Sequence, residues 1–133
     1  MGTRSMVGVM VGDKCRAVYV HWDGYLDGVG AWLQAYKTQA EVEELVSHGD
    51  RSSLEDGYYS ERGETGVDPK EYATFKKFFN AVENCWGEWY YVFKDGVWYC
   101  GNTYSSSTLY KTLTPYAEAR EAEKREECEE EAF

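Results

Sequence analysis

The clearest pattern along this chain is a pair of apolar runs at its start, separated by a short turn. Residues 4–11 carry apolar side chains on both faces of the expected strand, which is typical of a strand buried between two layers. Residues 15–22 follow with many strand-forming side chains, and Gly12 and Asp13 between the runs are turn residues. The pattern therefore predicts a β-hairpin at the beginning of the chain.

A second hairpin is predicted in the last third of the chain. Residues 88–94 and 97–101 are both rich in aromatic and β-branched side chains. They are separated by Asp95 and Gly96, a pair that favours a type I′ turn because both central residues of that turn need positive φ. This is the strongest local signal in the sequence.

Helical spacing of apolar residues appears between and after the hairpins. Thr38 and Glu41 form a capping box, and Asp68 with Pro69 is a typical helix start. The polar stretch 50–67 is the longest predicted loop. The predicted helices span residues 30–36, 38–49, 68–87 and 114 to the C-terminus.

This order of elements predicts an α+β fold in one domain, residues 1–133. We expect an antiparallel sheet of about four strands, built from the two hairpins, with helices mainly on one face. Residues 114–133 are expected to form an acidic C-terminal helix, because they hold eight glutamates against three basic residues, a net charge of −5.

The charge of the whole chain disfavours several classes of partner. Acidic residues outnumber basic ones by 24 to 14, so the net charge is −10. Direct binding of nucleic acid or of an anionic membrane depends on basic residues, and neither is expected here. We found no signal peptide or membrane-spanning segment, which favours the cytoplasm of the cell where the protein acts.

The four cysteines give no indication of a metal site or a cofactor. Cys15, Cys85, Cys100 and Cys128 are far apart in the sequence and form no C-x-x-C pair. We therefore expect reduced thiols, no bound metal and no cofactor.

The first candidate site is the stretch from His21 to Tyr25, together with Arg4 on the partner strand. A histidine near a carboxylate is suited to acid–base chemistry, so catalysis by His21 and Asp23 is one interpretation. A turn in which Asp23 has only a structural role is the simpler one. Contact with a ligand or partner is the third, and its residues would be Arg4, His21, Trp22, Asp23 and Tyr25.

The second candidate site is the aromatic hairpin. Side chains alternate across a strand, so Trp89, Tyr91 and Phe93 share one face while Tyr90 and Val92 share the other. Packing in the core, a protein interface and a stacking pocket for a small ligand all remain open. The contact residues predicted for an interface are Trp89, Tyr91 and Trp98.

The third candidate site is the acidic C-terminus. A solvated helix end is the simpler interpretation of this charge, and the alternative is a surface that imitates the phosphates of nucleic acid. The residues of that predicted acidic interface are Glu121, Glu126, Glu127, Glu129, Glu130 and Glu131.

Part of the sequence resembles a group of small bacteriophage proteins. The resemblance is carried by residues 2–5, which read G-T-R-S, by the H-W-D-G-Y motif of residues 21–25, and by Gly28, Val29, Gly30 and Leu33. Residues 45–54 and, more weakly, 95–99 extend it. The resemblance implies an origin in a phage or prophage accessory gene, and it supplies no catalytic residues.

These features lead to a first hypothesis of an inhibitor that binds a host protein. The expected target is a basic defence or nucleic-acid-handling enzyme, as for an anti-CRISPR or anti-restriction protein, with acidic and aromatic side chains making the contacts. One alternative is a sponge that sequesters a nucleotide immune signal. A second is a small enzyme that uses His21 and Asp23. A homodimer is compatible with each of these.

Overall fold

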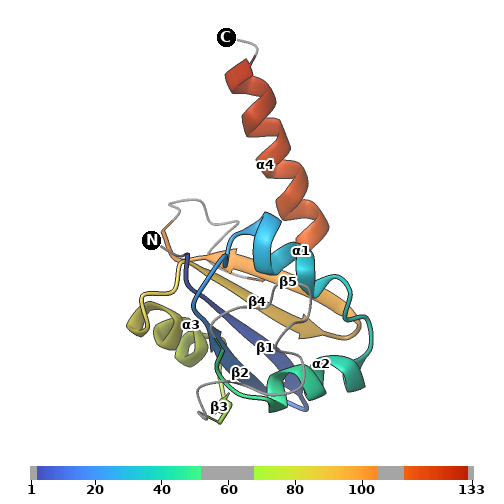
Figure 1. Cartoon of the computed structure of the whole chain (residues 1–133), viewed down its shortest axis with the longest axis vertical. Helices are drawn as coiled ribbons and strands as arrows, with labels where there is room; N and C mark the ends of the chain where they lie inside the picture. Colours follow the sequence, from blue (N-terminus) through green and yellow to red (C-terminus); the bar gives the residue numbers. More distant parts are fainter. Residues whose placement is uncertain (1–2, 52–67, 105–112, 132–133) are drawn as a thin grey trace.

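A computed structural model gives the structure of the protein, and it describes residues 3–51, 68–104 and 113–131, with the side chains of the last helix described as far as Glu123. A six-stranded sheet runs through the middle, in the order β3-β2-β1-β4-β5-β6 (Figure 1). The strands are β1 (Ser5–Val11), β2 (Lys14–Val20), β3 (Lys70–Tyr72), β4 (Trp89–Lys94), β5 (Val97–Asn102) and β6 (Thr114–Pro115).

Both predicted hairpins are present. β1 pairs antiparallel with β2, and β4 pairs antiparallel with β5. Between β4 and β5, Asp95 has φ 51° and Gly96 has φ 78°, the positive values that a type I′ turn requires. The second hairpin is therefore confirmed down to its turn.

The pairing that joins the two hairpins differs from the prediction. β1 and β4 lie side by side in parallel, with Ser5 opposite Trp89 and Val9 opposite Phe93. The sheet is therefore mixed, and it has six strands where about four antiparallel strands were expected. Its central strand β1 has a neighbour on each edge and side chains buried on both faces, which explains its nearly continuous apolar sequence.

The helix predicted from Asp68 begins seven residues later. α3 spans Phe75–Asn84, and the Thr74 hydroxyl caps it by accepting a hydrogen bond from the Lys77 backbone N–H at 3.2 Å. Residues 70–72 form β3 instead, paired with β2 at the edge of the sheet. The cap at Thr74 thus overrides the Asp–Pro start signal, and the backbone N–H and C=O groups before it are used in the sheet.

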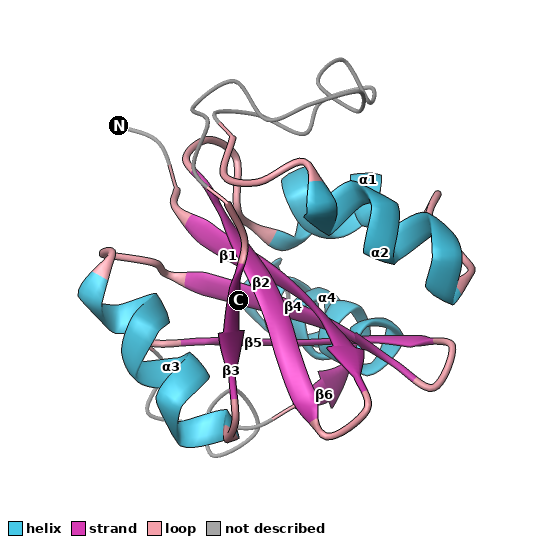
Figure 2. Cartoon of the chain, turned by 90° about the horizontal axis from the view of Figure 1, so that it is seen from below, coloured by secondary structure: helices cyan, strands magenta, loops and turns pink. Residues whose placement is uncertain are grey.

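Helices cover both faces of the sheet (Figure 2). The larger apolar core lies between one face and η1 (Leu26–Gly30), α1 (Ala31–Leu33), α2 (Gln39–Ser47) and the first turns of α4 (Tyr116–Glu131). The smaller core lies between the opposite face and α3, where Phe78 and Val82 pack on Tyr90 and Val92. Most helices are therefore on one face, as predicted, and the capping box of Thr38 and Glu41 at the start of α2 is confirmed.

The C-terminal helix α4 begins in the fold and extends away from it (Figure 1). Ala119 is buried in the larger core, and the Tyr116 hydroxyl donates a hydrogen bond to the Leu26 carbonyl at 2.9 Å. Arg120 forms a 2.6 Å ion pair with Asp27. The side chains of Glu126, Glu127, Glu129, Glu130 and Glu131 lie outside the described part, so their acidic interface stays a prediction.

Burial of two thiols predicts a loss of stability in mild alkali. Burial raises the pKa of Cys15 and Cys100 to about 12, whereas thiols of an unfolded chain ionise near pH 8.5. As the pH rises, the thiols of the unfolded chain therefore lose their protons before those of the folded chain. The free energy of unfolding has its highest value below pH 8 and falls as the pH rises through 9. Between pH 7.5 and 9.5 we expect a loss of about 1.4 kcal/mol per buried thiol.

Urea unfolding in the presence of a reductant measures this loss. The Cys100→Ala variant serves as the control, because it should lose about 1.4 kcal/mol less than the wild type over the same pH interval. An unfolding free energy that stays constant between the two pH values would contradict the assignment of these thiols to the core.

Candidate functional site

Four segments that are distant in sequence meet at one end of the sheet. Because β1 and β4 are parallel and each is paired with an antiparallel partner, the starts of β1 and β4 and the ends of β2 and β5 all lie there. The Arg4 carbonyl accepts a hydrogen bond from the Glu88 N–H at 2.8 Å, and the Glu88 carbonyl accepts one from the Thr103 N–H at 3.0 Å. These bonds fix the segments relative to one another.

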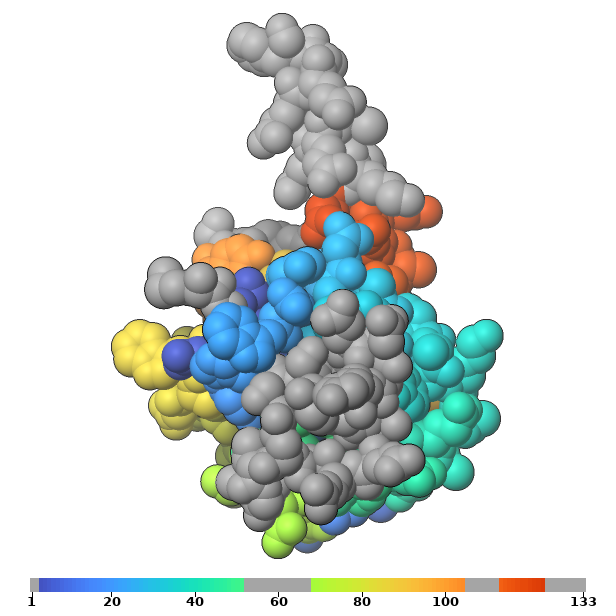
Figure 3. Space-filling view, in the orientation of Figure 1, coloured from blue at the N-terminus to red at the C-terminus, as the bar shows by residue number. Residues whose placement is uncertain are grey.

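This end of the sheet carries four large aromatic side chains in solvent. Their exposed fractions are 44% for Trp22, 43% for Tyr25, 78% for Trp86 and 64% for Tyr104. We call these four residues the aromatic end; the segments that carry them are blue, yellow and orange in Figure 3. Among the described residues, the other exposed large apolar side chains, Val11, Phe75 and Val97, lie at the opposite end.

The loop of residues 21–25 is held rigidly by its backbone. Asp23 has φ 58°, and its carbonyl accepts a 2.7 Å hydrogen bond from the Val29 N–H. The Gly24 N–H donates to the Thr3 carbonyl at 2.8 Å, and the Gly24 carbonyl accepts a buried 2.6 Å hydrogen bond from the Tyr91 hydroxyl. Asp23 thus has the structural role that the simpler interpretation gave it, and the loop directs Trp22 and Tyr25 into solvent.

His21 is paired with a tyrosine, not with the nearby carboxylate. Its Nδ1 shares a 2.6 Å hydrogen bond with the hydroxyl of Tyr19, and its ring makes an edge contact with Trp22 at 4.6 Å between centroids. Within the described residues, Asp23 makes its side-chain hydrogen bond with the Tyr25 hydroxyl, at 3.4 Å. The structure therefore does not bring His21 and Asp23 together as an acid–base pair.

Three of the predicted contact residues lie inside the fold. Trp89, Tyr91 and Trp98 are all buried in the larger core, and the Trp98 indole N–H donates to the Tyr36 carbonyl at 2.9 Å. Their side chains are not accessible to another protein, because α1, α2 and α4 cover that face of the sheet. Core packing, one of the alternatives left open by the sequence, accounts for them.

Two residues of the aromatic end, Trp86 and Tyr104, belong to the aromatic-rich part of the sequence but were not among the predicted contact residues. Trp86 falls within the helix predicted over residues 68–87. The helix ends at Asn84, however, and Trp86 takes φ 63°, which turns its side chain into solvent. Gly87, directly after it, was the signal for this ending. Tyr104 lies two residues after the last residue of β5, Asn102. The sequence alone does not show at which end of the sheet β5 ends, because that depends on how the strands pair.

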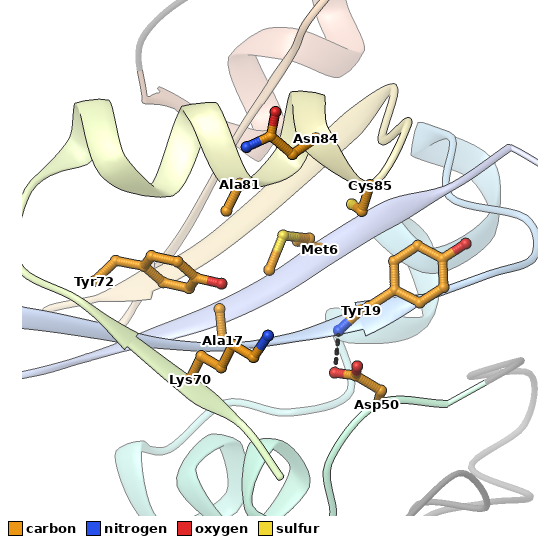
Figure 4. A pocket seen from close by; sticks show the side chains of 9 residues that line it. All are labelled: Met6, Ala17, Tyr19, Asp50, Lys70, Tyr72, Ala81, Asn84 and Cys85. Atoms are coloured by element: carbon orange, nitrogen blue, oxygen red, sulfur yellow. Dashed lines mark hydrogen bonds between the residues drawn. The ribbon is translucent and has the colours of Figure 1, made fainter. Parts of the chain in front are cut away.

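A pocket of about 440 Å³ lies beside the aromatic end, on the face of the sheet that α3 covers (Figure 4). It forms because small side chains, Ala17 on β2 and Ala81 on α3, face each other where the helix passes over the edge of the sheet. The other residues that line it are Met6, Tyr19, Asp50, Lys70, Tyr72, Asn84 and Cys85.

Charged groups are gathered at this pocket. Asp50 accepts a 2.8 Å hydrogen bond from the Tyr19 backbone N–H. Burial raises the pKa of the Asp50 carboxyl, and this hydrogen bond and the positive charge of Lys70 partly oppose that rise. Burial also raises the pKa of the Tyr19 hydroxyl, and the positive charge of Arg4 opposes that shift. Arg4 likewise opposes the rise that burial causes in the pKa of the Cys85 thiol.

Comparisons with protein-family models, with curated proteins and with solved structures give no match. Within residues 3–51, 68–104 and 113–123, His, Cys, Asp and Glu side chains form no group of three that could hold a metal ion. None of the helices in the described part of the chain is both long and apolar enough to cross a membrane.

The buried hydrogen bond between Tyr91 and Gly24 predicts the effect of Tyr91→Phe. Removal of the hydroxyl leaves the Gly24 carbonyl without this donor, and we expect a loss of about 1–3 kcal/mol in the free energy of unfolding. Amide hydrogen exchange should become faster in residues 21–25. Tyr99→Phe, at a half-buried tyrosine of β5, is the matched control. Equal stability of the two variants would show that the bond does not hold the loop.

Proposed function

We propose that this chain is a phage-encoded binding protein that inhibits a host defence or nucleic-acid-handling enzyme, of the anti-CRISPR or anti-restriction type. The observation that carries the proposal is the aromatic end, where Trp22, Tyr25, Trp86 and Tyr104 are exposed together on anchored segments. The phage origin rests on the resemblance of residues 2–5 and 21–25 to small phage proteins.

Tryptophan and tyrosine are the residue types that dominate the binding energy of protein interfaces. Exposed side chains of these types, brought to one end of the sheet, are typical of interaction sites. The side chains here are also preorganised, because Tyr91 fixes the loop that carries Trp22 and Tyr25, and α3 and β4 hold Trp86 between them. Preorganisation lowers the entropic cost of binding.

Charge favours a basic partner. The chain has a net charge of −10, half of it in residues 114–133. The helix α4 is tied by Arg120 to Asp27 and by Tyr116 to Leu26, in the segment that follows the loop of residues 21–25. Its negative charge is thus attached near the aromatic end, where it would steer a basic surface toward those side chains.

The two alternatives from the sequence receive unequal support. The pairing of His21 with Tyr19 gives no support to a small enzyme that uses His21 and Asp23. The pocket of about 440 Å³ favours a second candidate function, a sponge for a nucleotide immune signal, because it offers a cleft of suitable size lined by aromatic and charged side chains.

The first test of the binding proposal is the affinity of aromatic-end variants. The partner is recovered from host lysate at low salt with the tagged wild-type chain, purified, and titrated by calorimetry. Trp86→Ala and Tyr104→Ala should each weaken binding by about tenfold or more, as expected when a central aromatic contact is lost.

The control for this titration is Val97→Ala, an exposed apolar residue at the opposite end of the sheet. Its affinity should match that of the wild type. If Trp86→Ala and Tyr104→Ala bind as tightly as Val97→Ala, or if the recovered partner is an acidic protein, the proposal is wrong.

The second test is a truncation that removes residues 124–133. Truncation at Thr114 is unsuitable, because Tyr116 and Ala119 pack in the fold. The shorter chain keeps those contacts and loses five glutamates and two basic residues. We expect slower association with the partner at low salt and a difference from the wild type that disappears at high salt. Equal association rates at low salt would exclude steering by the acidic C-terminus.

A further inference from the structure

We propose that the pocket between α3 and strands β1–β3 binds a mononucleotide, with the base inside the pocket and the phosphate at its mouth. This inference rests on the second candidate function, the sponge for a nucleotide signal, and names the pocket as its binding site. It does not depend on whether the aromatic end binds a protein. None of the residues that line the pocket belongs to the first candidate site, although His21 of that site is joined to the lining residue Tyr19 by a 2.6 Å hydrogen bond.

The shape of the pocket suits a planar ring. Its volume, about 440 Å³, lies within the range of roughly 300–1,000 Å³ found for small-molecule sites. Two tyrosine rings, Tyr19 from β2 and Tyr72 from β3, stand on either side of it, and Met6 lies between them at its base (Figure 4). The ring of Tyr72 is supported by an edge contact with Phe78 at 5.8 Å, so it is a firm wall for stacking.

The polar groups suit the edge of a base. Asp50 lines the pocket next to Lys70, and its carboxylate is held in place by the hydrogen bond from the Tyr19 N–H. An ionised carboxylate only accepts hydrogen bonds, so it selects ring or amino N–H groups of a ligand. Asn84, at the end of α3, offers both a donor and an acceptor on the other side of the pocket.

Lys70 is the cation available for the phosphate among the residues that line the pocket, and its side chain is exposed at the sheet edge. A single positive charge suits a single phosphate. A polynucleotide would need a row of such charges and would be repelled by a chain of net charge −10.

Calorimetric titration of the full chain with GMP, UMP, guanosine and inorganic phosphate tests the inference. We expect saturable binding of GMP and weaker binding of UMP, because guanine presents two adjacent N–H donors (the ring N1–H and the amino group) to the Asp50 carboxylate, whereas uracil presents only its ring N3–H. Guanosine should bind less tightly than GMP, and inorganic phosphate at least about tenfold more weakly than GMP, because it makes no use of the tyrosine walls. No binding of either nucleotide, or phosphate bound as tightly as GMP, would overturn the proposal.

Three variants locate the binding. Ala81→Leu fills the pocket and should weaken GMP binding by about tenfold or more. Lys70→Gln should weaken GMP but not guanosine, and Asp50→Asn should abolish the preference for GMP over UMP. Lys14→Gln, at an exposed lysine beside the β1–β2 turn, is the control and should bind as the wild type does.

Thermal unfolding of each variant shows whether the fold is kept. If Ala81→Leu does not fold, Lys70→Gln and Asp50→Asn decide the question, since both positions are outside the apolar cores. GMP binding that is unchanged in all folded pocket variants would overturn the proposal. Loss of GMP binding in Ala81→Leu with protein capture retained would separate this site from the aromatic end.

Discussion

The parallel pairing of β1 with β4 is the interaction on which the rest of the structure depends. Each of these strands belongs to a local hairpin, and their pairing joins the two hairpins into one sheet with β1 at its centre. Because the strands are parallel, residues before β1 and before β4 emerge at the same end, where the Arg4 carbonyl accepts hydrogen bonds from the Glu88 and Trp89 N–H groups. An antiparallel pairing would separate these segments by the length of the sheet.

Two surfaces follow from this arrangement. The segment after β2 and the segment before β4 lie at the same end of the sheet, and they expose Trp22 and Trp86. The tryptophans within the strands, in contrast, are buried beneath helices. The second surface is the pocket on the face of the sheet that α3 covers. There α3 lies above Ala17, whose small side chain leaves space for the pocket. The same pairing that buries most of the aromatic residues thus decides which few are available for binding.

Local signals in the sequence were sufficient for the local elements. The turn at Asp95 and Gly96 and the capping box at Thr38 were predictable because a few neighbouring residues determine each of them. The direction of pairing between β1 and β4 was not, since an apolar run can pair in either direction. The candidate site was therefore predicted only in part: His21 to Tyr25 was noticed as a motif, but its proximity to Trp86 and to Asp50 depends on pairings across the sheet.

The most direct measurement is the set of backbone nuclear Overhauser effects (NOEs) between β1 and β4 in solution. The parallel register predicts cross-strand NOEs that connect Val7 with Tyr91, Ser5 with Trp89, and Val9 with Phe93. NOEs that connect Ser5 with Phe93 and Val9 with Trp89 would instead show antiparallel pairing. That result would place Trp86 and Trp22 at opposite ends of the sheet and contradict the account.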